Sequence, residues 1–170
     1  RDYICFMEPD MVVTVCDATA LERNLNLVLQ ILETTDNLIV CVNLMDEAEK
    51  KKIRIDLGAL EKKLGVYVTG ASAGQNVGMD LLMDKAAKLK KHGPPHKTLK
   101  ILYDEPIETA VSLLEPAVKK EDLKGLSTRW AALRLIDTDE SFLPALENYL
   151  GRPLSPDTMD KVRETREYLA

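Results

Sequence analysis

The sequence predicts two structural units in series, an α/β unit built on a parallel sheet and then an all-helical unit. Three short apolar runs, which begin at Met11, Leu38 and Val66, alternate with helical patterns through the first half. Such alternation is typical of a parallel sheet whose strands are joined by right-handed crossover helices. After His92 the sequence keeps helical periodicity and shows no convincing strand. We therefore assign residues 1–93 to the α/β unit and 94–170 to the helical unit.

The first predicted strand covers Met11–Cys16 and ends at Asp17. Thr19 and Glu22 have the spacing of a capping box, in which each side chain accepts a hydrogen bond from the other residue's backbone N–H. This pattern predicts that a helix begins there. Its core-facing stripe would be Leu21, Leu25, Val28, Leu29 and Leu32.

The second predicted strand, Leu38–Val42, consists of five consecutive apolar residues. Such a run fits a strand covered on both faces. Open α/β sheets bind their ligands at the carboxyl ends of the strands. Asn43 and Asp46 follow this strand directly and therefore lie where a binding loop belongs. The alternative is that the two residues only cap a helix or form a turn.

The third predicted strand, 66–69, is preceded by a helix over 56–64 that Gly65 ends, and is followed by Ser72 and Ala73. The next helix is predicted over 77–91. The Ser-Ala pair either forms a plain turn or places backbone N–H groups against a ligand. That helix would bury Met79, Leu82, Ala86 and Leu89.

The two loops together resemble the base-recognition loops of GTP-binding domains. In those domains an Asn/Thr-Lys-x-Asp loop follows one strand and a Ser-Ala loop follows the next, with Leu44 here in the Lys position. The acid is needed because guanine presents two adjacent donors, N1–H and the 2-amino group, and one carboxylate accepts from both. The residues predicted to bind guanine are Asn43, Asp46, Ser72 and Ala73.

Composition excludes several other classes. The chain has 170 residues, 45% of them hydrophobic and 30% charged, with a net charge of −5. An acidic chain is a poor nucleic-acid binder, and no run approaches the ~18–20 apolar residues of a membrane span. The cysteines, Cys5, Cys16 and Cys41, lack metal-site spacing and predict reduced thiols in the cytosol. His92 and His96 flank a turn, which favours a linker over a metal site.

The second half predicts helices with a core anchored by Trp130, Leu133 and Ile136. An acidic group at 137–140 is expected to cap a helix junction, although a cation site is the alternative. The predicted helices cover 107–114, 121–126, 127–136, 141–150 and 156–169.

Several stretches resemble the cytosolic region of bacterial ferrous iron transport protein B. The most distinctive is Asp17-Ala-Thr-Ala-Leu-Glu-Arg-Asn-Leu25, followed by Asn43-Leu-Met-Asp46. Glu105-Pro-Ile-Glu108 and Arg129-Trp-Ala-Ala-Leu-Arg-Leu135 resemble the helical domain that follows the G domain in that family. The resemblance covers the whole chain and implies a partial P-loop-GTPase-like parallel sheet with flanking helices, followed by an all-helical domain.

Matched residue by residue, the resemblance implies that the Asp46 carboxylate accepts two hydrogen bonds from guanine. It also implies that Asn43 joins its loop to the neighbouring loops. Ser72 and Ala73 match the Ser-Ala motif, with the Ala73 N–H as donor to guanine O6. The chain departs from the family at Ala71, where Thr is usual, and at Asn76, where Gly is common. Because Asn tolerates the left-handed conformation, the loop is still expected to form.

The family's phosphate-binding pattern, Gly-x-x-x-x-Gly-Lys-[Ser/Thr], does not occur in the sequence. We therefore expect the chain to be part of a longer parent protein, a GTPase in which the ligands of Mg²⁺ and of the GTP or GDP phosphates lie upstream. This stretch would hold no catalytic residue, no metal ligand and no visible iron site. The helical domain would relay nucleotide state to a membrane region at the cytoplasmic face of the inner membrane and favour the GDP-bound state.

Two other functions stay open from the sequence. One is a non-catalytic interaction scaffold built on a degenerate nucleotide-binding domain. The other is a G protein of the ribosome-assembly type, which the acidic charge and the helical domain disfavour. A second copy of the chain is a further expected partner, because half a sheet would leave one strand edge uncovered.

Overall fold

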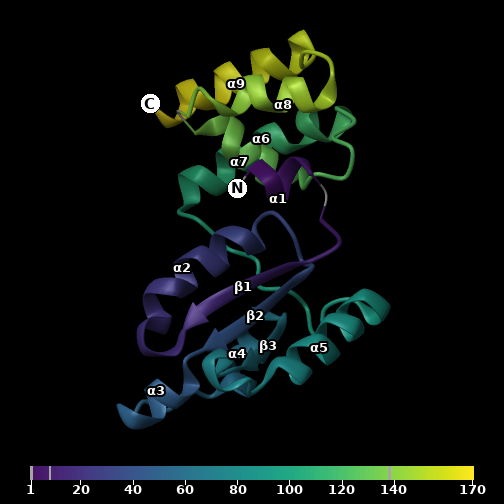
Figure 1. Cartoon of the computed structure of the whole chain (residues 1–170). Helices are drawn as coiled ribbons and strands as arrows, with labels where there is room; N and C mark the ends of the chain where they lie inside the picture. The colour runs from purple at the N-terminus through teal and green to yellow at the C-terminus, as the bar shows by residue number, and fades with distance from the viewer. Residues whose placement is uncertain (1, 8, 138) are drawn as a thin grey trace. The chain divides into compact units, whose positions relative to one another are not determined.

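Three parallel strands organise the first of two structural units (Figure 1). The structure, a computed structural model, describes residues 2–7, 9–137 and 139–170 and separates into the units 1–101 and 102–170. The strands β1 (Val12–Asp17), β2 (Leu38–Asn43) and β3 (Tyr67–Gly70) lie in the order β1-β2-β3, and both pairings are parallel. The predicted parallel sheet is therefore confirmed.

One face of this sheet carries the hydrophobic core of the first unit. Successive side chains of a strand point to opposite faces, and Cys16, Val40 and Val68 point to the face on which Val28 and Leu64 pack. The helical elements of this unit are α1 (Asp2–Phe6), η1 (Ala18–Ala20), α2 (Leu21–Leu32), α3 (Met45–Lys50), α4 (Leu57–Leu64), η2 (Ala73–Gln75) and α5 (Met79–His92).

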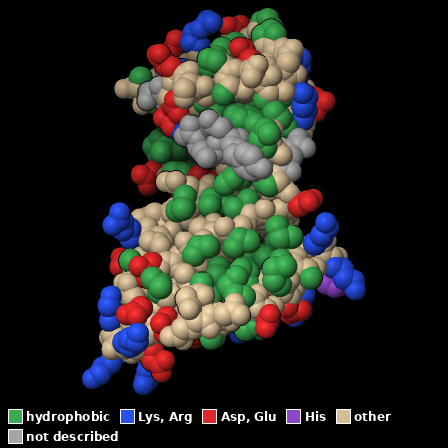
Figure 2. Space-filling view, viewed as in Figure 1, with side chains coloured by type: hydrophobic (Ala, Val, Ile, Leu, Met, Phe, Trp, Pro, Cys, Tyr) green, Lys and Arg blue, Asp and Glu red, His purple; other side chains and the backbone are tan. Residues whose placement is uncertain are grey.

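The opposite face is covered by α5 only in part. Ile39 and Cys41 of β2 are buried there, but their register partners on β1, Val13 and Val15, are 41% and 60% exposed. Met83 on α5 is also exposed, and Figure 2 shows hydrophobic side chains gathered on this side of the unit. Within the described residues β1 pairs with β2 alone, so its outer edge and this face together form an open apolar surface.

The outer edge of β3, by contrast, is blocked by an ion pair. Glu61 of α4 accepts a hydrogen bond from the Val68 N–H at 2.9 Å, and Lys85 of α5 donates to the Val68 carbonyl at 2.5 Å. Lys85 and Glu61 are themselves 2.6 Å apart. Burial would raise the pKa of Glu61, but the hydrogen bonds from Lys85 and Val68 outweigh it and lower the pKa. The pair takes the place of a neighbouring strand, so within the described residues the β1 edge alone is open to strand addition.

The capping box predicted at the start of α2 does not form. Ala20 precedes the helix, and no side chain caps it. The carboxylate of Asp17 instead accepts from the Thr19 N–H at 2.7 Å, and the Asn24 side chain accepts from the Asp17 N–H at 2.8 Å. The box fails because a 3-10 turn occupies Ala18–Ala20 and Asp17 caps that turn. Its hydrogen bonds with Thr19 lower the pKa of Asp17.

The second unit is all-helical, as predicted, but its first helix is longer than expected. It consists of α6 (Glu105–Lys120), α7 (Thr128–Ile136), α8 (Phe142–Leu150) and α9 (Pro156–Leu169). The helix expected over 107–114 continues through Pro116, and the helix expected over 121–126 is absent. The buried Glu121 side chain explains the absence, because it accepts hydrogen bonds from Ser155 and Thr158 at the start of α9.

The core of this unit uses two of the three predicted anchors. Trp130 and Ile136 are buried, and the Trp130 ring meets the Phe142 ring edge-to-face with centroids 5.2 Å apart. Leu133 is only partly buried, and Leu135 is buried instead. Helical spacing alone did not separate these two neighbours.

The acidic group at 137–140 pairs with one arginine. Asp137 and Asp139 accept hydrogen bonds from Arg134 at 2.7 and 2.6 Å, and residue 138 lies outside the described residues. In the part of the chain that the structure describes, no helix has both the length and the apolar character needed to cross a membrane.

Candidate functional site

The loops that follow β2 and β3 lie against each other at the carboxyl edge of the sheet. The Ala71 N–H donates to the Val42 carbonyl at 2.8 Å, and the Met45 N–H donates to the Ala71 carbonyl at 3.1 Å. Leu44, which lies between them, has a φ of 63°, a left-handed conformation that residues other than glycine rarely adopt. This turn directs the first N–H groups of α3 toward the loop after β3.

The structure brings the four predicted site residues together. Asn43 Oδ1 accepts a hydrogen bond from the Ala73 N–H at 3.0 Å, and Ser72 Oγ accepts from the Asp46 N–H at 3.1 Å. Ser72 is buried, Ala73 is exposed, and the Asp46 side chain is 24% exposed. Ser72 therefore holds the loop that carries Asp46, and the carboxylate itself faces solvent. Recognition of guanine by these residues stays a prediction.

The Asp46 carboxylate has two neighbours that the sequence patterns did not indicate. Gln75 Nε2 donates to Asp46 Oδ2 at 3.1 Å, and Lys50 Nζ lies 4.0 Å from the same oxygen. Lys50 is one helical turn from Asp46, and its closer partner is Glu47 at 2.8 Å. Gln75 comes from the other loop, and no motif spacing pointed to it.

A narrow turn shapes the loop that carries Ser72 and Ala73. The backbone groups of Ser72 and Val77 pair as an isolated antiparallel bridge, with N–H to carbonyl distances of 3.0 and 3.2 Å. Asn76 has a φ of 57°, so an asparagine takes the left-handed position of this turn in place of a glycine. Gly78 has a φ of 85°, and a Cβ there would collide with the carbonyl oxygen of Gly70. The loop therefore forms despite its departure from the family pattern.

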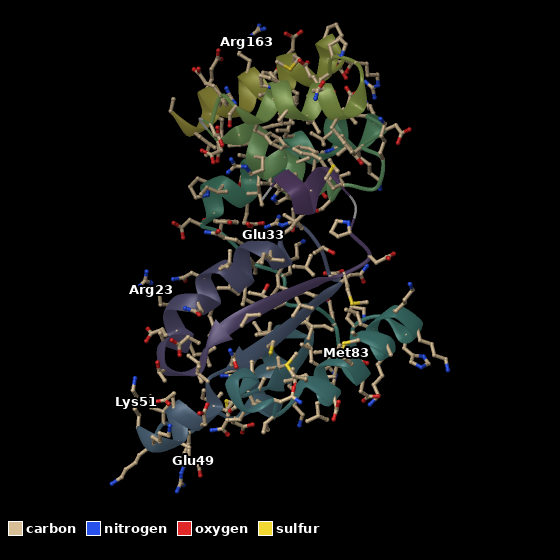
Figure 3. The ribbon with its side chains drawn as sticks, in the orientation of Figure 1. Arg23, Glu33, Glu49, Lys51, Met83 and Arg163 are labelled. Carbon is tan, nitrogen blue, oxygen red and sulfur yellow. The ribbon has the colours of Figure 1, made fainter. Side chains whose placement is uncertain are left out.

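A groove of about 620 Å³ lies near this edge but is not lined by any of the four predicted residues. It runs along the start of α2, and Figure 3 shows Arg23 there, at the same end of the unit as Lys51. The lining residues are Ala18, Thr19, Ala20, Leu21, Glu22, Arg23, Asn26, Ile53 and Ile55. Among residues 2–7, 9–137 and 139–170, no three His, Cys, Asp or Glu side chains gather closely enough to hold a metal ion.

Comparison with known proteins decides the family. Residues 1–86 match the family model described as ferrous iron transport protein B, and residues 103–170 match the model of the FeoB cytosolic helical domain. The chain belongs to the ferrous iron transport protein B family. The two matched regions are the two parts that the sequence resemblance had indicated, a G domain and a helical domain.

Curated FeoB relatives extend far beyond the length of this chain. The Fe(2+) transporter FeoB of Salmonella typhimurium is 33% identical over 137 residues, which are 81% of this chain and 17% of that protein. The Escherichia coli K12 transporter is 31% identical over the same share of each chain. The chain thus spans about a sixth of the length of these relatives.

Solved FeoB structures match both units. The cytosolic domain of the T. maritima FeoB iron transporter in a GDP form has a TM-score of 0.77 at 26% identity, covering 99% of this chain and 68% of that one. A variant of S. thermophilus NFeoB bound to GDP has a TM-score of 0.80 at 28% identity, covering 98% and 61%. These matches support the fold class of a parallel sheet with flanking helices followed by a helical domain.

Proposed function

We propose that this chain supplies guanine recognition and a helical relay in the GTP-binding region of a ferrous iron uptake transporter. The observation that carries the proposal is the joining of the Asn43 and Ser72 loops by hydrogen bonds of 3.0 and 3.1 Å at the carboxyl edge of the sheet. Related structures named as GDP and GMPPNP forms of FeoB support guanine nucleotides as the ligand.

Each site residue has a separate task in this proposal. The Asp46 carboxylate accepts from guanine N1–H and from the 2-amino group, a pair of donors that adenine lacks. Ser72 Oγ holds the backbone N–H of Asp46 and so fixes the carboxylate. The Ala73 N–H donates to guanine O6. In the structure this N–H donates to Asn43, so the base and the Asn43 oxygen compete for it.

Competition binding tests the proposal. GDP should displace a fluorescent guanine nucleotide from the parent protein, and ADP at the same concentration should not. An Asp46→Ala variant should lose this preference. Equal displacement by both nucleotides would contradict guanine recognition and favour the scaffold alternative, which the internal hydrogen bonds between the two loops also fit.

We further propose that phosphate and Mg²⁺ binding belong to residues outside this chain. Phosphoryl transfer depends on a loop and a metal that position the phosphates, and the sequence lacks the Gly-x-x-x-x-Gly-Lys-[Ser/Thr] pattern. We therefore assign the metal no step on this chain.

The 170-residue chain alone is therefore expected not to hydrolyse GTP above background, although the parent protein does. Phosphate release should be measured for the purified chain, the chain with Asp46→Ala, and the parent protein. Release that survives purification and disappears in the Asp46→Ala chain would show a catalytic element within these residues.

The helical unit is proposed to relay nucleotide state to the membrane region of the parent protein at the cytoplasmic face of the inner membrane. Its motif residues are tied together, because Arg129 contacts both carboxylate oxygens of Glu108 at 3.0 and 2.6 Å. We keep the domain boundary between residues 93 and 94 as a proposal. It lies in a stretch without helix or strand that joins α5 to α6.

The open edge of β1 predicts that the isolated chain self-associates. Val13 and Val15 are exposed beside unpaired backbone groups, and such an edge pairs readily with another chain. Replacing Val15 by Lys should lower the association constant measured by sedimentation velocity. The control is Leu27→Lys, because Leu27 is also half exposed but lies on α2. A wild-type chain that stays monomeric at high concentration would contradict this prediction.

A further inference from the structure

Gln75 contacts the centre of the proposed base site without belonging to either recognition motif. It ends η2, and its backbone N–H donates to the Ser72 carbonyl at 2.9 Å. The left-handed Asn76 follows it and closes the turn with a 3.0 Å hydrogen bond to Ala73. This turn directs the exposed Gln75 side chain to Asp46, where Nε2 lies 3.1 Å from Oδ2.

The donor that Gln75 presents is of the same kind as those of guanine. Its amide N–H meets a carboxylate oxygen, as the guanine N1–H or 2-amino N–H would. Within the described residues Asp46 Oδ1 accepts no hydrogen bond, so the carboxylate is half engaged. A base that donates hydrogen bonds to both carboxylate oxygens has to displace the Gln75 amide from Oδ2.

We infer that Gln75 is a positioning residue that occupies Asp46 in the empty site and competes with guanine for it. This inference rests on the proposed function. While the site is empty, the Gln75 amide keeps the carboxylate oriented toward the loop after β3. When guanine leaves, the same amide recaptures Oδ2. Gln75 therefore stabilises the empty site and weakens guanine nucleotide binding.

Removing the competing donor should tighten binding. One hydrogen bond at a solvent-accessible site contributes modestly, so Gln75→Met should lower the GDP dissociation constant by about three- to tenfold. Most of this change should appear as faster GDP association, because Gln75 holds the carboxylate only in the empty site and so lowers the fraction of the protein that is competent to bind. Gln75→Ala should give the same result, which separates loss of the donor from any contact made by the Met side chain.

The experiment measures GDP affinity and the rates of GDP association and release for the parent protein with stopped-flow fluorescence. The matched control is Gln30→Met, the same substitution at an exposed position on α2. A double-mutant cycle adds Asp46→Ala, in which the effect of Gln75→Met should vanish. A structural effect of Gln75 on folding would persist in that background and would lower the melting temperature of the single variant.

The outcomes separate this inference from the proposed function. If Asp46→Ala weakens GDP binding but Gln75→Met and Gln75→Ala leave affinity and the association rate unchanged, the inference is overturned and the proposed function stands. If the effect of Gln75→Met persists in the Asp46→Ala background, the inference is again overturned. If Asp46→Ala does not change GDP binding, both fail.

Discussion

Replacing Asp46 by Asn is expected to weaken GDP binding to the parent protein by about 10⁴-fold, because the bound base would cover the carboxylate and hydrogen bonds buried in a complex discriminate on that scale. The carboxylate accepts from two guanine donors, whereas an amide places its own N–H donors against the 2-amino group. Xanthine carries a carbonyl at that position, so the variant should prefer xanthosine diphosphate. Equilibrium titrations with both nucleotides measure the change.

The matched control for this substitution is Glu49→Gln. Glu49 is exposed on the same helix, α3, and forms no ion pair within the described residues, so its replacement removes the same charge without changing the contacts of Asp46. GDP affinity should not change in this variant. Unchanged GDP affinity in the Asp46→Asn variant would remove Asp46 from base recognition.

Replacing Glu121 by Gln is expected to destabilise the helical unit by about 2 kcal/mol, since the buried carboxylate accepts charge-assisted hydrogen bonds that a neutral amide weakens or loses. The Glu121 side chain is 5% exposed and lies 2.6 Å from Arg152 Nη1. It also accepts hydrogen bonds from the Ser155 N–H at 2.9 Å and from Thr158 Oγ1 at 2.8 Å. These contacts join the end of α6 to the start of α9. Urea unfolding measures the loss.

The same carboxylate predicts a pH dependence. Burial would raise the pKa of Glu121, but hydrogen bonds from Ser155, Arg152 and Thr158 outweigh it and lower the pKa from 4.5 to about 2. Because the folded state has the lower pKa, the stabilisation is complete above pH 4.5 and is lost as the pH falls toward 2. In the Glu121→Gln variant, this part of the loss of unfolding free energy at low pH should be absent.

Glu164→Gln provides the control, because that side chain is 64% exposed and pairs only with a lysine on the same helix. Its unfolding free energy should follow the wild-type pH profile. A Glu121→Gln chain with the wild-type profile would show that Glu121 is not the group that titrates.

Local patterns predicted the strands and the loops that follow them, because both depend on neighbours in sequence. The continuous apolar run at 38–42 fits a covered strand better than a half-exposed one, and the parallel order placed the loops after β2 and β3 at one edge. The capping box at Thr19 failed because Asp17, two residues earlier, took the Thr19 N–H first. A capping pattern alone does not show whether Asp17 or Glu22 accepts the hydrogen bond from the Thr19 N–H.

The remaining features depend on contacts between distant residues. The absence of a helix at 121–126 follows from Glu121 reaching residues more than thirty positions away. The contact of Gln75 with Asp46 crosses from one loop to another, 29 residues apart. Gln75 belongs to no motif, and Glu121 falls in a stretch whose local pattern predicted a helix, so sequence reasoning had no signal for either contact. Both were found from geometry.

Guanine recognition by the Asn43–Asp46 and Ser72–Ala73 loops is tested most directly by nuclear magnetic resonance of the ¹⁵N-labelled chain. Titration with GDP should shift the backbone amides of Asp46 and Ala73, because one holds the base-binding carboxylate and the other donates to O6. Titration with ADP should leave both amides in place. Equal shifts with the two nucleotides, or GDP shifts confined to residues away from these loops, would contradict the account.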